Sequence, residues 1–158
     1  MKVELVLILH NIRSVYNVGA IFRTADASGV KKIYLTGYTP TPLDRFGRKR
    51  KDVAKSALGA EEVVTWEQYE DPHKLIEKLK KIDFEIIALE QASQSKDYRE
   101  LKLKKNTALL IGSEIEGLPQ TLLETSDAII EIPMRGKKES LNVSVAVGVA
   151  LYELTRNE

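Results

Sequence analysis

The chain has 158 residues, of which 43% are apolar and 30% charged, a composition typical of one globular domain with a substantial core. It has no cysteine, which excludes disulfides and thiol catalysis, and its two histidines, His10 and His73, lack the spacing of metal ligands. The net charge of +1 does not mark the whole molecule as a polyanion binder. We therefore expect a single metal-free, cytoplasmic domain over residues 1–158.

The first apolar run, "VELVLILH", lies close to the N-terminus. Glu4 interrupts it and no small-residue cleavage site follows, so a buried strand is a better interpretation than a signal peptide. Apolar and β-branched runs predict strands over 3–10, 32–37, 62–66, 84–90, 107–112 and 128–133. Several of these runs lack polar alternation, as expected for parallel strands that are covered on both faces.

Helical patterns separate these strands. The first predicts an amphipathic helix that Asn17 caps and Gly29 ends, with apolar positions at Val18, Ile21, Phe22 and Ala25. A second helix, over 71–81, begins with Asp71 as N-cap and a proline at its first position, and Pro119 opens a short third helix. Strands that alternate with helices in this way indicate an α/β fold with a parallel sheet.

The segment after the last predicted strand, "ESLNVSVAVGVALYE", allows two interpretations. Its odd positions are apolar, which fits a strand, but about thirteen residues is long for an element whose usual length is about five or six. A helix that begins at Ser140 and extends toward Arg156 completes the strand–helix alternation. Because this helix is apolar nearly all round, with Ser144 and Gly148 on one face, we expect it to pack on the sheet and against a partner subunit.

Two runs concentrate the positive charge. Residues 45–55 hold six basic side chains and the single Asp52, a local charge of 6 − 1 = +5, and residues 134–138 hold three more basic side chains. One basic run alone is as often a solvated loop as a binding site. Two such runs in a small neutral domain favour a phosphate-bearing partner.

Three further segments lie at predicted strand ends or helix starts: "NVGAIFRTADASG" (17–29), "LLIGSEIEGLP" (109–119) and "IPMRGKKESLN" (132–142). Open α/β sheets bind their ligands at such ends. Each segment alone also has a structural explanation, since Gly112 and Gly117 can simply make a turn and Ser140 can be only a helix cap. The chain has no phosphate-loop pattern and no three-glycine dinucleotide fingerprint, which argues against nucleotide hydrolysis and nicotinamide chemistry.

Taken in this order, the three segments resemble the three motifs of the SpoU/TrmH family of RNA ribose 2′-O-methyltransferases, within the SPOUT superfamily. The resemblance covers essentially the whole chain. It implies a parallel sheet with helices on both faces, a C-terminal segment threaded through a deep trefoil knot, and a helix after "SLN". It also implies a homodimer whose interface contains the first and last helices and whose active site takes groups from both chains.

The family's cofactor is S-adenosylmethionine, held mostly by backbone groups. Carried over by motif position, the cofactor-binding residues are Leu89, Gly112, Ile132, Met134 and Leu141. The resemblance implies catalytic roles for Asn17, Arg23, Glu114, Ser140 and Asn142. Arg23 is the expected activator of the ribose hydroxyl, but a guanidinium essentially never deprotonates in proteins, so it is better suited to stabilise the forming oxyanion and fix a phosphate. A bound phosphate and Ser140 both remain candidate proton acceptors.

We predict no separate RNA-binding domain within residues 1–158, so that the two basic runs supply much of the RNA contact. The predicted RNA-binding residues are Arg45, Arg48, Lys49, Arg50 and Lys137. The substrate is expected to be structured RNA, transfer or ribosomal. The alternative is a non-catalytic knotted RNA-binding module, which retention of Arg23, Glu114, Ser140 and Asn142 together argues against.

Overall fold

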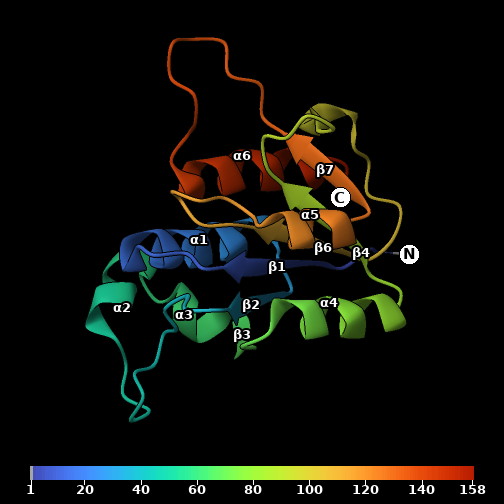
Figure 1. Ribbon diagram of the computed structural model, residues 1–158. Helices are drawn as coiled ribbons and strands as arrows, with labels where there is room; N and C mark the ends of the chain where they lie inside the picture. Colours follow the sequence, from blue (N-terminus) through green and yellow to red (C-terminus); the bar gives the residue numbers. More distant parts are fainter. Residues whose placement is uncertain (1) are drawn as a thin grey trace.

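The computed structural model describes residues 2–158. Seven strands form one sheet in the order β3-β2-β1-β6-β4-β7-β5, and every neighbouring pair is parallel (Figure 1). The strands are β1 Leu5–His10, β2 Lys32–Thr36, β3 Thr65–Gln68, β4 Glu85–Leu89, β5 Lys96–Asp97, β6 Thr107–Ile111 and β7 Ala128–Glu131. The prediction of an α/β fold with a parallel sheet is confirmed.

Helices cover both faces of this sheet. They are α1 Val15–Ser28, α2 Lys51–Ala57, α3 Ala60–Val63, α4 Pro72–Lys81, the 3₁₀ turn η1 Tyr98–Glu100, α5 Gln120–Thr125 and α6 Val143–Leu154. One core lies between the sheet and helices α1, α2, α3 and α6, and a second lies between the sheet and helices α4 and α5. Within residues 2–158, no helix is both long and apolar enough to cross a lipid bilayer.

Alternate residues of each central strand enter different cores. In β1, Leu7 and Leu9 pack toward α1 and α6, whereas Val6 and Ile8 pack toward α4 and α5. All six residues of β1 are buried. The uninterrupted apolar runs of the sequence thus follow from strands that are buried on both sides.

Two of the four predicted helix starts are wrong by a few residues. Helix α1 begins three residues earlier than expected, because the Ser14 hydroxyl accepts the Asn17 backbone N–H at 3.2 Å and so acts as the N-cap. Helix α6 is capped by Asn142 and not by Ser140, since the Asn142 side chain accepts the backbone N–H groups of Ser144 and Val145. The predicted caps of helices α1 and α4 at Gly29 and Asp71 are confirmed.

The strand predicted over 62–66 is displaced. Residues 60–63 form helix α3, and the strand begins only at Thr65, where the chain pairs with Lys32 of β2. The apolar run is too short for its period to distinguish a helical turn from a strand. The structure also adds helix α2, which occupies part of the basic run at 45–55 and was not predicted.

The apolar C-terminal segment is a helix, as predicted, and it ends at Leu154. It lies on the sheet beside α1, with Val147, Ala150 and Leu151 fully buried. A Cβ added at Gly148 would lie 3.4 Å from Thr24 Cγ2 of α1. This is an ordinary van der Waals distance, so packing against α1 of the same chain does not require glycine at this position. The expectation that Gly148 serves contact with a partner stays a prediction.

Candidate active site

A cleft of about 680 Å³ opens at the carboxyl ends of β4, β6 and β7, where the loops after these strands meet. We call it the main cleft. It is lined by all five predicted cofactor residues, Leu89, Gly112, Ile132, Met134 and Leu141. Four of the five predicted catalytic residues also line it, namely Asn17, Glu114, Ser140 and Asn142. The three sequence motifs therefore meet in one place, although 97 residues separate Asn17 from Glu114.

The turn after β6 requires glycine at its first position. A Cβ at Gly112 would lie 2.6 Å from the Gly117 carbonyl carbon and 2.7 Å from the Leu118 nitrogen. Both atoms belong to backbone, which cannot move aside cheaply. Gly117 itself has a positive φ of 66°, a conformation that glycine adopts without strain. Because Gly112 has no side chain, the turn can fold back on itself and present backbone groups to the cleft.

Glu90 is a site residue that the sequence reasoning missed. Its carboxylate accepts the Leu118 N–H at 2.9 Å and the Gln91 N–H at 3.0 Å, and so joins the loop after β4 to the turn after β6. The Gln91 side-chain amide donates to the Glu139 carbonyl at 2.8 Å, which joins the same loop to the segment before α6. Glu90 and Gln91 directly follow a buried strand, and this position could have indicated from the sequence that they belong to the site. Both residues line the main cleft and fix the relative positions of its loops.

Glu114 binds the start of helix α1. Its two carboxylate oxygens accept the backbone N–H groups of Arg13 at 2.8 Å and Ser14 at 2.9 Å, and one of them also accepts the Asn17 side-chain amide at 3.1 Å. Burial raises the pKa of this carboxyl, but the hydrogen bonds outweigh burial and hold the pKa below its ordinary value. A carboxylate at a helix N-terminus also interacts favourably with the helix dipole.

Asn17 connects this contact to the last motif. Asn17 is buried, and its side-chain oxygen accepts a hydrogen bond from the Asn142 side-chain amide at 3.2 Å. The Asn17 side-chain amide group donates in turn to the Glu114 carboxylate. Asn142 in turn caps α6. These bonds fix the orientation of both amides and hold α1, the turn after β6 and α6 together, so Asn17 and Asn142 act at least as positioning residues.

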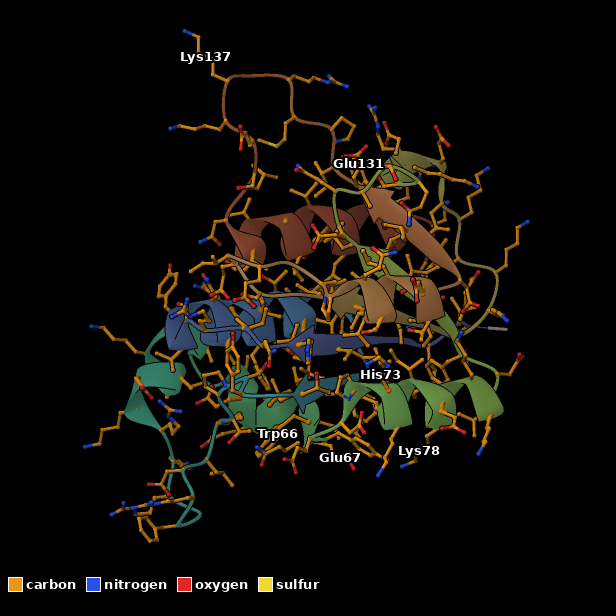
Figure 2. The ribbon with its side chains drawn as sticks, in the orientation of Figure 1. Trp66, Glu67, His73, Lys78, Glu131 and Lys137 are labelled. Atoms are coloured by element: carbon orange, nitrogen blue, oxygen red, sulfur yellow. The ribbon has the colours of Figure 1, made fainter. Side chains whose placement is uncertain are left out.

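The segment 132–142 between β7 and α6 projects from the body of the molecule (Figure 1), and Lys137 lies near its outer end, directed away from the sheet (Figure 2). Ser140 is exposed on the return of this segment, at the wall of the main cleft. Among residues 2–158, no side chain forms a hydrogen bond with the Ser140 hydroxyl. This hydroxyl is accordingly available to a ligand.

Arg23 does not line the main cleft. It is exposed on α1 and lines a second cleft of about 510 Å³ with Tyr16, Lys55, Leu58 and Tyr152. Arg23 follows Asn17 by six positions on α1, so the two side chains differ by about 240° in direction around the helix axis. No carboxylate of the described chain forms an ion pair with Arg23. The structure thus separates Arg23 from the four predicted catalytic residues that it brings together.

The basic run at 45–50 is partly neutralised by neighbouring carboxylates. Arg48 pairs with Asp44 at 2.9 Å, Arg50 pairs with Asp52 at 2.7 Å, and Lys49 pairs with Glu62. Arg45 has no such partner within residues 2–158. The local charge of +5 counted along the sequence therefore overstates the positive field of this surface.

Comparison with known proteins agrees with this arrangement. The family model described as "SpoU rRNA Methylase family" matches residues 4–152. The chain belongs to the SpoU methylase family. It is 35% identical over 153 residues to the tRNA (guanosine(18)-2′-O)-methyltransferase of Aquifex aeolicus, covering 97% of this chain and 69% of that protein. The resemblance drawn from the three motifs is confirmed.

Two further relatives extend the comparison. A TrmH family tRNA/rRNA methyltransferase assigned in Staphylococcus aureus is 36% identical over 151 residues, covering 96% of this chain and 58% of that protein. The crystal structure of the AdoMet-bound rRNA methyltransferase from Sinorhizobium meliloti superposes with a TM-score of 0.89 at 29% identity, covering 99% of this chain and 57% of that one. The chain thus spans little more than half of the length of these two relatives.

Proposed function

We propose that this SpoU domain transfers the methyl group of S-adenosylmethionine to a ribose 2′-hydroxyl of structured RNA, transfer or ribosomal. The observation that carries the proposal is the main cleft, in which the three family motifs supply all five predicted cofactor residues and four of the five predicted catalytic residues. The name of the relative from Aquifex aeolicus specifies methylation of a guanosine 2′-oxygen in transfer RNA, which supports the ribose as acceptor.

The main cleft suits S-adenosylmethionine. Its volume of about 680 Å³ lies within the range of about 300–1,000 Å³ common for small-molecule sites. Leu89, Ile132 and Leu141 would offer apolar contacts to such a ligand, and the turn that Gly112 allows lines the same cleft. When bound, the cofactor supplies a sulfonium-activated methyl group. The relative from Sinorhizobium meliloti has been solved with this cofactor bound.

Within the proposed reaction, the ribose oxygen gains the methyl group and loses its proton. Arg23 cannot accept that proton, so its role is to bind the adjacent phosphate and stabilise the negative charge that develops on the oxygen. A phosphate oxygen of the substrate can take up the proton, and the exposed Ser140 hydroxyl can share it through a hydrogen bond. Asn17, Glu114 and Asn142 hold the loops in place through their mutual hydrogen bonds.

The separation of Arg23 from the main cleft favours an active site shared by two chains. A stripe on the outer face of α6, formed by Val145, Val149 and Tyr152, stays exposed in the single chain, as does Tyr16 of α1. Burying this stripe against a second copy gives an isologous homodimer. In such a dimer, Arg23 of one chain would face the main cleft of the other.

The proposal includes the family's C-terminal knot. The segment between β4 and β6 passes beyond β7 to form β5, so β7 lies between β4 and β5 in the sheet. Tyr98, Leu101 and Leu103 of the same segment pack against the core that contains α6. This arrangement supports a chain that passes from β7 to α6 through the loop made by residues 90–106.

Methyl transfer from labelled S-adenosylmethionine to total transfer and ribosomal RNA tests the function. We expect label in RNA with the wild type, and far less label with Arg23→Ala. Isothermal titration should show that Arg23→Ala binds the cofactor as the wild type does, while single-turnover methylation falls by about 10²–10³-fold. Arg23→Lys should restore little, because an ammonium lacks the planar fork of guanidinium. RNA binding with no methyl transfer to either RNA would support the non-catalytic module instead.

A further inference from the structure

The loop Asp44–Arg50, which we call the Phe46 loop, carries a large aromatic side chain at its tip. Phe46 keeps 66% of its surface exposed. The loop is closed by an antiparallel bridge between Leu43 and Lys49, and Gly47 adopts a positive φ of 77° that allows the tight turn. In Figure 1 this loop projects from the lower end of the molecule, beyond helix α2. Nothing in the sheet or the main cleft requires a phenylalanine at this position.

Asp44 makes the Phe46 loop rigid. One of its carboxylate oxygens accepts the backbone N–H groups of Phe46 at 2.8 Å and Arg48 at 2.9 Å, and the other accepts Arg48 Nε at 2.9 Å. The Asp44 backbone N–H donates to the Arg48 carbonyl at 2.8 Å. Because the loop is ordered before a ligand arrives, binding at its tip costs little conformational entropy.

Two guanidinium groups lie against the Phe46 ring. The Arg45 Cζ is 4.8 Å from the ring centroid and the Arg48 Cζ is 5.0 Å from it. Arg48 is also held by Asp44, whereas Arg45 has no carboxylate partner among the described residues. Arg45 can therefore leave the ring for a phosphate, and a flat group can take its place on the ring.

The chemistry of this tip suits a nucleotide better than an apolar protein surface. An apolar partner would have to desolvate the charges of Arg45 and Arg48, at a cost that the ring alone does not offset. An unpaired base has a π face that stacks on an aromatic ring whatever its sequence, and its own phosphate offers a partner for a guanidinium. Duplex RNA keeps its bases stacked inside and does not offer this face.

The Phe46 loop is also fixed to the helix that carries Arg23. Helix α2 follows the loop directly, and its Ser56 hydroxyl donates to the Tyr16 carbonyl of α1 at 2.9 Å. A Cβ at Gly19 of α1 would lie 2.5 Å from the Val53 carbonyl oxygen, so glycine is needed for this close packing. A nucleotide held at the loop tip is thereby positioned with respect to α1.

We propose that Phe46 stacks on one unpaired base of the RNA substrate while Arg45 binds the phosphate of that nucleotide. The inference rests on the proposed function, since it names the part of the RNA that this loop contacts. It adds a residue, Phe46, and a type of contact, base stacking, to the electrostatic contacts expected from the basic run.

Binding of a fluorescein-labelled, single-stranded 12-nucleotide oligouridylate tests the proposal, with an abasic oligonucleotide of the same length as the matched ligand. Phe46→Ala should weaken binding of oligouridylate by about 5- to 150-fold, the range measured when one stacking aromatic is removed. It should leave binding of the abasic ligand unchanged. Phe46→Tyr should bind as the wild type does. Arg45→Ala should reduce the slope of log affinity against log salt by about 0.7, and Phe46→Ala should not change that slope.

Each of three binding results would overturn the inference: equal affinity of the wild type and Phe46→Ala for oligouridylate, an equal loss for the abasic ligand, or wild-type protein that binds transfer RNA but not oligouridylate. A change of oligomeric state in Phe46→Ala would also overturn it, because the ring would then be a protein contact. Failure of the proposed function is recognised separately, as wild-type protein that methylates no RNA. Sedimentation and cofactor titration of each variant show that it is folded.

Discussion

Glu114→Gln tests the link between the turn after β6 and helix α1. The carboxylate accepts three N–H groups, two of them from the backbone at the start of α1. A glutamine keeps the shape of the side chain but offers only one acceptor oxygen. Its NH₂ group would face an N–H donor, and two donors cannot form a hydrogen bond with each other. A hydrogen bond to a charged group contributes about 1.5–3 kcal/mol, and we take about 1–2 kcal/mol here because water screens this exposed carboxylate. For a domain of this size the melting temperature should fall by about 2–8 °C.

The stability difference between Glu114→Gln and the wild type should depend on pH. The pKa of Glu114 is lower in the folded than in the unfolded state. Its contribution to the free energy of unfolding is therefore complete above the unfolded-state pKa, and it is lost as the pH falls through the folded-state pKa. Urea unfolding of the wild type and Glu114→Gln should therefore differ at pH 7, and the difference should shrink below about pH 4.5. Glu116→Gln is the matched control, since no hydrogen bond of the Glu116 side chain is found within residues 2–158. Equal stability of Glu114→Gln and wild type at pH 7 would refute the reasoning.

Three other substitutions have defined outcomes. Gly112→Ala should weaken S-adenosylmethionine binding at least tenfold in calorimetry while the circular dichroism spectrum is retained, and unchanged affinity would show that the turn tolerates a Cβ. Gly19→Ala places a Cβ 2.5 Å from a backbone oxygen of α2 and should destabilise the fold by about 1–3 kcal/mol in urea unfolding; wild-type stability would contradict this. Val145→Glu should give folded monomers in sedimentation velocity, whereas Val63→Glu, at an exposed valine outside α6, should remain dimeric; a monomeric wild type would remove the proposed dimer.

The motif segments identified nine of the residues that line the main cleft, but not Glu90 or Gln91. Gly112, Ile132 and Leu141 are brought together because parallel strands end at one edge of a sheet, which a reader of the sequence can anticipate. The C-terminal helix was predictable for a similar reason, since the strand–helix alternation required it. The helix caps were harder to predict, because two nearby residues satisfy the same capping preference in each case: Ser14 and Asn17 for α1, and Ser140 and Asn142 for α6.

Contacts between distant segments could not be predicted. Nothing in the order of residues shows that Glu90 accepts the Leu118 N–H, or that Lys49 pairs with Glu62 across a helix. The position of Arg23 was partly predictable, since the helical rotation from Asn17 already turns it away from the main cleft. Which partner lies opposite Arg23 depends on the assembly, and the single chain supplies only an exposed apolar stripe as a sign of it.

Identifying the methylated atom tests the central proposal most directly. RNA labelled by this protein from S-adenosylmethionine should be digested to nucleosides and analysed by mass spectrometry, with alkaline hydrolysis in parallel. We predict a nucleoside that carries its methyl group on the ribose, in a linkage that resists alkali because a 2′-O-methyl group cannot attack the neighbouring phosphate. A methyl group found on a base, or an alkali-sensitive linkage at the labelled position, would contradict the account.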